Sequence, residues 1–193
     1  MTGVQTCALP ICFPVTIGAG SGYVDSREEF VRDYDRSIFS TPVKRLQDKA
    51  QVFPLEECDS VRTRLTHSLE VSCVAKGLAW RIANWLSKNG DISKCDMRGI
   101  EYIAATCGLI HDLGNPPFGH AGEYAIQGWF EANKKSVRAN LGKRAHLIND
   151  FLKFEGNAQT LRLVMNLQIL ADNHGLNLTY GTLSAASKYL GIS

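Results

Sequence analysis

Histidine and carboxylate side chains are concentrated in the stretch HDLGNPPFGHAGE, residues 111–123 of the 193-residue chain. His111 directly precedes Asp112, and His120 and Glu123 follow a pair of prolines. Imidazole nitrogens and carboxylate oxygens together suit divalent ions such as manganese, iron, magnesium or zinc. The stretch therefore indicates either a metal-bearing active site or, in the simpler interpretation, a buried histidine beside a rigid proline turn.

A further histidine, His67, lies upstream in a segment with helical periodicity, 61–87. It shares one apolar face of the expected helix with Val71, Val74 and Leu78, which follow at steps of four, three and four residues. A lone histidine on such a face is usually an ordinary core residue. Burying two histidines and a carboxylate without partners would cost on the order of several kcal/mol each, however, and a divalent cation would offset that cost.

The helix that carries the His111-Asp112 pair must end close to it. Neighbouring side chains on a helix point about 100° apart, so only a terminating turn lets both reach one ion. Gly114 supplies such an end, and Asp96 is expected to cap the start of the same helix. We therefore expect both side chains of the pair to converge at a helix terminus.

Helical periodicity continues along the rest of the chain, without a convincing alternating strand pattern. After the extended turn at the two prolines, a helix is expected from about Ala121, with His120 and Glu123 on the same side. The sequence therefore predicts an all-α fold. Asp59 or Ser60 is expected to cap the helix over 61–87. The other predicted helices are one opened by a capping box at Ser26 and Glu29, one over 43–53, and those of LGKRAHLINDFLKF, AQTLRLVMNLQILADNHG and 179–190.

The composition is that of one soluble globular domain, with 45% hydrophobic and 21% charged residues. No apolar run approaches the roughly 18 to 20 residues that span a bilayer, so a membrane-integral protein is not expected. Six cysteines without a CxxC pair favour a reducing, cytoplasmic location. A net charge of +2 does not by itself indicate nucleic-acid binding. A local basic cluster is interpreted as a solvated face, with phosphate contact as the alternative: Lys134, Lys135, Arg138, Lys143 and Arg144.

The first residues of the chain are set apart from this domain. The string MTGVQTCALPI lacks the basic n-region and the long apolar h-region of a secretory signal. It is similar instead to the translation of a sequencing-library adapter, and the glycine-rich stretch after it has no sustained period. We therefore interpret residues 1–24 as a non-native or disordered leader.

Five strings in order carry a resemblance to a known family: KRLQDKAQVF, RTRLTHSLEV, HDLGNPPFGHAGE, FEGNAQ and GLNLT. From about Phe30 to the C-terminus, the chain resembles the N-terminal part of the bacterial deoxyguanosine triphosphate triphosphohydrolases, a branch of the HD-domain metal phosphohydrolases. The resemblance implies an all-α HD-domain helical bundle, and residues 25–193 are interpreted as a partial HD domain. It also implies hydrolysis of dGTP or other dNTPs to deoxynucleoside and inorganic triphosphate. The alternatives are an HD phosphohydrolase acting on another nucleotide, and an inactive fragment.

The resemblance also implies roles for individual residues. His67, His111 and Asp112 correspond to three metal ligands, and His120 and Glu123 to the catalytic pair. Mn²⁺ or Mg²⁺ is the expected ion, and Fe²⁺ or Zn²⁺ also suits the donor set. The substrate-binding residues implied are Arg64 toward phosphate, Gln51 toward the sugar or base, and Asn115 as a polar group of the pocket.

One ligand of the family has no counterpart in the sequence. The fourth metal ligand, a downstream aspartate, is missing, and neither Asp150 nor Asp172 fits its pattern. We therefore expect a C-terminally truncated domain with an incomplete site and weaker metal binding. For the full-length parent, the resemblance implies a homo-oligomer, commonly a hexamer, that acts on dNTP substrates and responds to nucleotide or single-stranded DNA effectors.

Overall fold

The computed structural model describes residues 28–51, 62–168 and 175–187. Within these ranges the chain is mostly helical, and the β-type contact present is an isolated bridge between Ala50 and Thr63. The predicted all-α fold is therefore confirmed. Several predicted features lie outside the described residues, namely the leader 1–24, Ser26, Asp59, Ser60 and Asp172.

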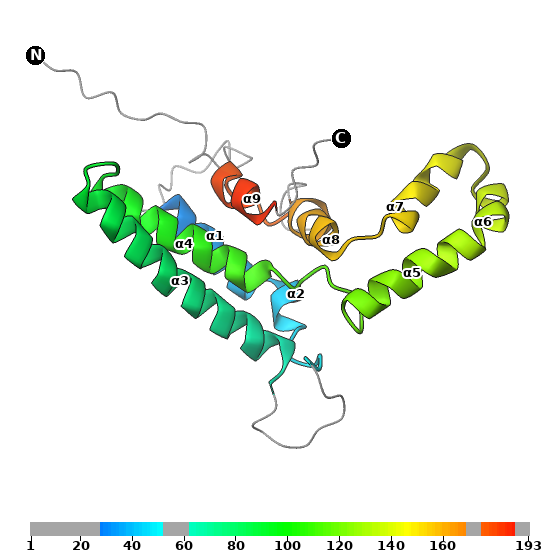
Figure 1. The fold of residues 1–193 in the computed structure, drawn as a ribbon, viewed down its shortest axis with the longest axis horizontal. Coiled ribbons are helices and arrows are strands. Elements are labelled where there is room, and N and C mark those ends of the chain that lie inside the picture. Colours follow the sequence, from blue (N-terminus) through cyan, green and yellow to red (C-terminus); the bar gives the residue numbers. More distant parts are fainter. Residues whose placement is uncertain (1–27, 52–61, 169–174, 188–193) are drawn as a thin grey trace, which may run out of the picture.

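The long helices α3 and α4 lie side by side, and α1 and α9 pack against α4 (Figure 1). Helices α5, α6 and α7 extend away from this bundle as an arm (Figure 1). The arm begins directly after the HDLGNPP stretch, so the residues of interest lie where bundle and arm meet. The bounds are α1 Glu29–Phe39, α2 Thr41–Lys44, α3 Arg64–Lys88, α4 Lys94–Ile110, α5 His120–Ala132, α6 Lys134–Leu141, η2 Gly142–Leu147, α7 Ile148–Leu152, α8 Gly156–Arg162, η3 Leu163–Leu167 and α9 Tyr180–Ala186.

The hydrophobic core lies directly beneath the His111-Asp112 pair. Ile110 and Leu113, which flank the pair in sequence, are both buried in it. Each such side chain contributes roughly 1.5–3 kcal/mol when it is fully buried, so the backbone around the pair is firmly held. The other buried members come from α2 and its following turn, the end of α4, η3 and the segment 175–187: Val43, Leu46, Leu109, Val164, Leu176, Leu178 and Leu183.

A buried carboxylate ties α1 to the start of α9. Asp33 Oδ2 accepts hydrogen bonds from the backbone N–H of Thr179 at 2.9 Å and from the hydroxyls of Thr179 and Thr182, each at 2.7 Å. Burial nevertheless raises the pKa of Asp33 above its ordinary value of 3.8, against the lowering effect of these bonds and of Arg36. The first described helix and the GLNLT segment are thus joined through one side chain.

The predicted caps of the two long helices were wrong by about one turn. Thr63, and not Asp59 or Ser60, is the N-cap of α3, and its side chain accepts a backbone N–H of the first turn. Ser93 caps α4, while Asp96 is the third helical residue, and its Oδ2 accepts a hydrogen bond from the Ser93 N–H at 3.1 Å. Each true cap is a hydroxyl residue close to the first helical turn, as capping requires.

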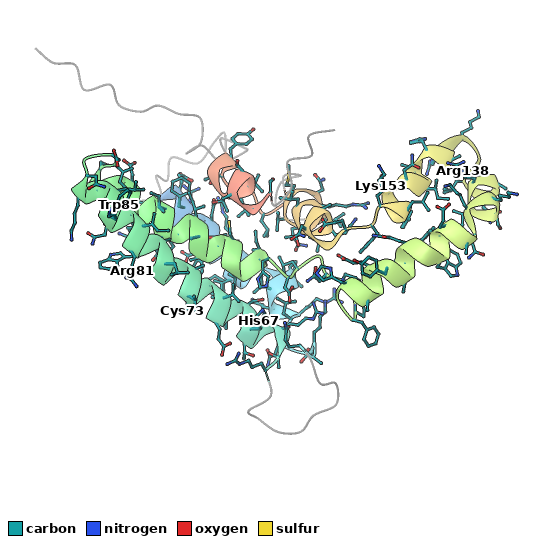
Figure 2. All side chains as sticks on the ribbon, viewed as in Figure 1. His67, Cys73, Arg81, Trp85, Arg138 and Lys153 are labelled. Carbon is teal, nitrogen blue, oxygen red and sulfur yellow. The ribbon has the colours of Figure 1, made fainter. Side chains whose placement is uncertain are left out.

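The buried face of α3 also differs from the predicted one. Val74 and Leu78 are 62% and 57% exposed, and His67 is only half-buried. Figure 2 shows His67 near the N-terminal end of α3, with Cys73, Arg81 and Trp85 further along the same helix. The residues that α3 does bury are mostly small: Arg64, Ser68, Ser72, Ala79 and Ala83.

Close packing of α3 against α4 explains this difference. A Cβ atom on Gly108 would lie 2.8 Å from the Cα atom of Ser72, so the two backbones are nearly in contact. The Ser72 hydroxyl also donates to the carbonyl of Ala105 at 2.7 Å. Large side chains do not fit between helices this close, so the apolar stripe of α3 faces outward.

Several predicted helices are shorter or divided. The helix after the prolines begins at His120, one residue before the expected start. LGKRAHLINDFLKF is split between the end of α6, the 3-10 turn η2 and α7, and AQTLRLVMNLQILADNHG leaves helical geometry at Gln168. The last predicted helix, 179–190, is described as α9, with Thr179 as its N-cap. In the described part of the chain, no helix is both long and apolar enough to cross a membrane.

Candidate metal centre and catalytic pair

Three of the predicted ligands converge in the structure. His67 comes from α3, His111 caps the end of α4, and Asp112 follows it. One ligand atom from each residue lies within 4.8 Å of the other two, and the imidazole rings meet edge to face with centroids 5.4 Å apart. Two ligands bound to one ion at about 2.0–2.2 Å lie at most about 4.4 Å apart, so small side-chain rotations would complete the contact. The donor set therefore fits a divalent cation.

The end of α4 orients His111. Its Nδ1 atom lies 2.8 Å from the carbonyl oxygen of Gly108, which can only accept, so Nδ1 carries the proton. The other ring nitrogen, Nε2, lies 3.7 Å from Asp112 Oδ1 and is the ring atom available to a metal ion. A metal-ligating histidine usually binds the ion through one ring nitrogen, while its other ring nitrogen donates a hydrogen bond to a group such as a carbonyl.

Two side chains from different segments hold the carboxylate of Asp112. The amide Nδ2 of Asn115 donates to Oδ1, and Arg64 Nη1 lies 3.6 Å from Oδ2. Arg64 is itself buried and donates from Nε to the carbonyl of Ala50 at 3.3 Å. Asp112 is 7% exposed, so the arginine supplies the positive charge that a buried carboxylate requires.

His120 and Glu123 form a hydrogen-bonded pair at the start of α5. His120 Nδ1 lies 2.7 Å from Glu123 Oε2. The imidazole side chain is 82% exposed, whereas that of Glu123 is only 9% exposed. The other oxygen, Oε1, accepts the backbone N–H of Gly156 at 2.7 Å. A carboxylate fixed at both oxygens thus holds an exposed imidazole in one orientation.

Gly156 is a positioning residue that the sequence analysis did not single out. It opens α8 within the FEGNAQ string, and a Cβ there would lie 2.3 Å from Asn115 Oδ1 and 2.9 Å from Glu123 Oε1. A Cβ on Gly114 would in turn meet the Gly156 carbonyl at 2.1 Å. Two glycines therefore let α8 close onto the HDLGN turn. The sequence did contain a signal for this role: a glycine at the start of a helix, inside the FEGNAQ string that carries the family resemblance.

A hollow of about 640 Å³ adjoins the centre. It brings together Gln51, Arg64, Asp112 and Asn115, and includes Gly119 but not the exposed His120. The Oε1 atom of Gln51 is buried and has no hydrogen-bond partner among the described residues. A buried acceptor without a partner is costly, so this atom is suited to a donor on a ligand. The remaining lining residues are Lys49, Ala50, Pro116, Pro117 and Phe118.

The predicted basic cluster lies on the arm, in α6 and η2. Arg138 is labelled on this arm and His67 in the bundle (Figure 2). Lys134 forms an ion pair with Glu131 at 3.1 Å, and the other four cations are exposed. Contact of this surface with phosphate stays a prediction.

Comparison with known proteins agrees with this geometry. The family model described as "HD domain" matches residues 64–176. Proteins called "Deoxyguanosinetriphosphate triphosphohydrolase-like protein" are similar to the chain: one from Listeria monocytogenes is 45% identical over 86% of this chain and 37% of its own length. Those from Synechocystis and Pseudomonas aeruginosa are 44% and 42% identical, each over 84% of this chain and 37% and 36% of their own lengths.

The chain thus spans a little over a third of the length of the curated relatives that it matches. The HD match covers more than half of the chain and includes all three clustered ligands together with His120, Glu123 and Gly156. The described segments 28–51, 62–63 and 177–187 fall outside it. The chain therefore belongs to the HD domain family.

Proposed function

We propose that this chain carries the metal and catalytic residues of a nucleotide phosphohydrolase that cleaves dGTP or other dNTPs into deoxynucleoside and inorganic triphosphate. The observation that carries the proposal is the convergence of His67, His111 and Asp112 within 4.8 Å, where Asp112 also lines a hollow together with Arg64. The names of the relatives supply the substrate class. A hollow of about 640 Å³ is within the usual range for small-molecule sites.

His67, His111 and Asp112 would hold one divalent cation, with Mn²⁺ or Mg²⁺ the expected ions and Fe²⁺ or Zn²⁺ compatible with the donors. Such an ion supplies charge neutralisation at a phosphoryl group. The chain's own contribution is to orient the ligands. The Gly108 carbonyl does this for His111 by accepting a hydrogen bond from Nδ1.

Two side chains of the hollow would position the substrate, and a third would hold a metal ligand. Phosphoryl transfer requires mainly alignment and neutralisation of charge. The guanidinium of Arg64 would face the polyphosphate, and the unpartnered Oε1 of Gln51 would accept a hydrogen bond from the sugar or base. Asn115 would keep the Asp112 carboxylate in place through its amide.

His120 would move the proton. Water adds to the α-phosphorus, the bond from phosphorus to the 5′ oxygen breaks, and that oxygen must gain a proton as the deoxynucleoside leaves. His120 is suited to this role because its Nδ1 is held by Glu123 while the ring is exposed. Glu123, fixed by the Gly156 N–H, keeps the ring in one tautomer and orientation.

Product identity tests the proposal. The 193-residue chain is incubated with each of the four dNTPs and excess Mn²⁺, and the products are separated by anion-exchange chromatography. We expect inorganic triphosphate and deoxynucleoside, and we expect the His111→Ala variant to release neither. Pyrophosphate or orthophosphate as the product would overturn the proposed reaction. Metal binding without hydrolysis of any dNTP would favour an inactive fragment.

The wider properties of the parent protein are proposals of the same kind. Homo-oligomerisation, a nucleotide or single-stranded DNA effector, and a cytoplasmic location rest on the resemblance to the triphosphohydrolases. Size-exclusion chromatography with light scattering tests the first of these. Salt-dependent binding of a single-stranded oligonucleotide, with charge reversal on α6, tests the second.

A further inference from the structure

The turn between the HD pair and α5 contains a residue in an unusual conformation. The N–H of Gly119 donates to the carbonyl of Pro116 at 3.1 Å, so Pro117 and Phe118 are the central residues of a β-turn. Phe118 has a φ of 67°, in the left-handed region. Proline followed by a left-handed residue is the pattern of a type II turn, whose third position favours glycine or asparagine. A phenylalanine at this position is strained.

The phenyl ring of Phe118 contributes little packing to the fold that would offset this strain. Phe118 is 85% exposed, the largest exposed fraction among the large apolar side chains of the described residues. The turn itself is firmly held, because α5 closes on it: a Cβ on Gly122 would lie 2.1 Å from the Pro117 carbonyl oxygen. The ring is therefore presented to solvent from a rigid backbone. Strain that is kept without a packing benefit is characteristic of functional sites.

The position of the ring suggests what it contacts. Phe118 lines the same hollow as Arg64, Asp112 and Gln51. The polar side chains of this hollow suit phosphate and hydroxyl groups, whereas Phe118 offers a flat apolar face. A nucleobase is the planar part of a nucleotide, and bases stack on exposed aromatic side chains.

We propose that Phe118 is a binding residue whose ring stacks on the nucleobase of the substrate, and that the turn places it there at a cost in backbone strain. The inference rests on the proposed function for the nucleotide class. It adds a residue that contacts the face of the base, beside Gln51, which would bond the sugar or base, and apart from Arg64 and the metal ligands, which act on the phosphates.

Fragment binding tests the assignment without any need for turnover. Deoxyguanosine and inorganic triphosphate are titrated separately into the Mn²⁺-loaded chain by isothermal titration calorimetry. We expect Phe118→Leu to weaken deoxyguanosine binding about tenfold, the scale of losing one stacked base, and to leave triphosphate binding unchanged. Phe39→Leu is the matched control, because Phe39 is also an exposed phenylalanine, at 72%, and does not line the hollow.

A Phe118→Gly variant separates binding from folding. Glycine relieves the left-handed strain, so the melting temperature should stay equal or rise while deoxyguanosine binding weakens as in Phe118→Leu. Unchanged deoxyguanosine affinity in both variants would overturn the inference and leave the proposed function standing. A lower melting temperature with both ligands weakened would also overturn it, as a structural role. If the unaltered chain binds neither fragment, the proposed function fails as well.

Discussion

Substituting Gly156 by alanine should disturb the catalytic pair of His120 and Glu123, although Gly156 is not a member of that pair. A Cβ there would lie 2.3 Å from Asn115 Oδ1 and 2.9 Å from Glu123 Oε1, whereas ordinary contact begins near 3.4 Å. The amide oxygen must therefore retreat by about 1.1 Å and the carboxylate oxygen by about 0.5 Å. Both atoms belong to side chains that hold site residues, Asp112 and His120.

The size of the effect follows from these displacements. Moving Glu123 weakens its bond to the Gly156 N–H and turns its other oxygen away from His120 Nδ1. A misplacement on the scale of 1 Å at a reacting group costs about a hundredfold in rate. We therefore expect Gly156→Ala to lower the rate of triphosphate release by about that factor, while the clash is absorbed locally and the helical content is retained.

Gly128→Ala is the matched control, because a Cβ at Gly128, within α5, meets no atom within 4 Å. It should keep the full rate and gain about 0.5–1 kcal/mol of stability, as alanine does in a helix interior. Nitrogen-15 NMR of the histidine rings adds a readout that needs no turnover: the Nδ1–H tautomer of His120 should be lost only in Gly156→Ala. A variant with the unaltered rate and tautomer would refute the positioning role of Gly156.

Three further predictions concern the metal, pH and thiols. His111→Ala should weaken Mn²⁺ binding at least tenfold in calorimetry. The control His146→Ala, on the exposed η2 turn, should leave Mn²⁺ binding unchanged. If both variants bind Mn²⁺ with the same affinity, His111 is not a ligand. Because the folded-state pKa of Asp33 is raised above 3.8, its contribution to stability is largest below that pH and declines as pH rises through the folded-state pKa. Urea unfolding should show this decline relative to Asp33→Asn, and parallel pH profiles would contradict it. Burial raises the pKa of Cys107 to about 11, so at neutral pH this thiol is not the reactive thiolate. Iodoacetamide should therefore label the exposed Cys73 first, as followed by mass spectrometry. Equal labelling of the two cysteines would show that Cys107 is accessible.

Local chemistry explains what could be predicted from the sequence. Gly114 and the two prolines end one helix and delay the next, so the placement of His111 and Asp112 at a helix terminus follows from neighbours within a few residues. The close pairing of His120 with Glu123 follows from a spacing of three at a helix start. The all-α fold follows in the same way from periodicity and the lack of strand patterns.

The buried face of α3 shows where periodicity was insufficient. Val74 and Leu78 have the helical spacing of a core stripe, yet they are exposed, whereas Ser68 and Ser72 are buried. A hydrophobic pattern identifies a face but does not say which neighbour will lie against it. The neighbour here is α4, which approaches at Gly108 too closely for large side chains.

The sequence by itself determined the helical fold, the residue types able to bind a metal, and the pairing of side chains within one turn of each other. Only the tertiary structure decided the contacts between distant segments. Gly156 reaches Glu123 across 33 residues, and Asp33 reaches Thr179 across 146. Arg64 likewise faces Asp112 from the start of another helix. Such contacts depend on how whole helices pack, because a hydrogen bond requires its donor and acceptor atoms to lie about 3 Å apart, and no local pattern contains the distance between two remote segments.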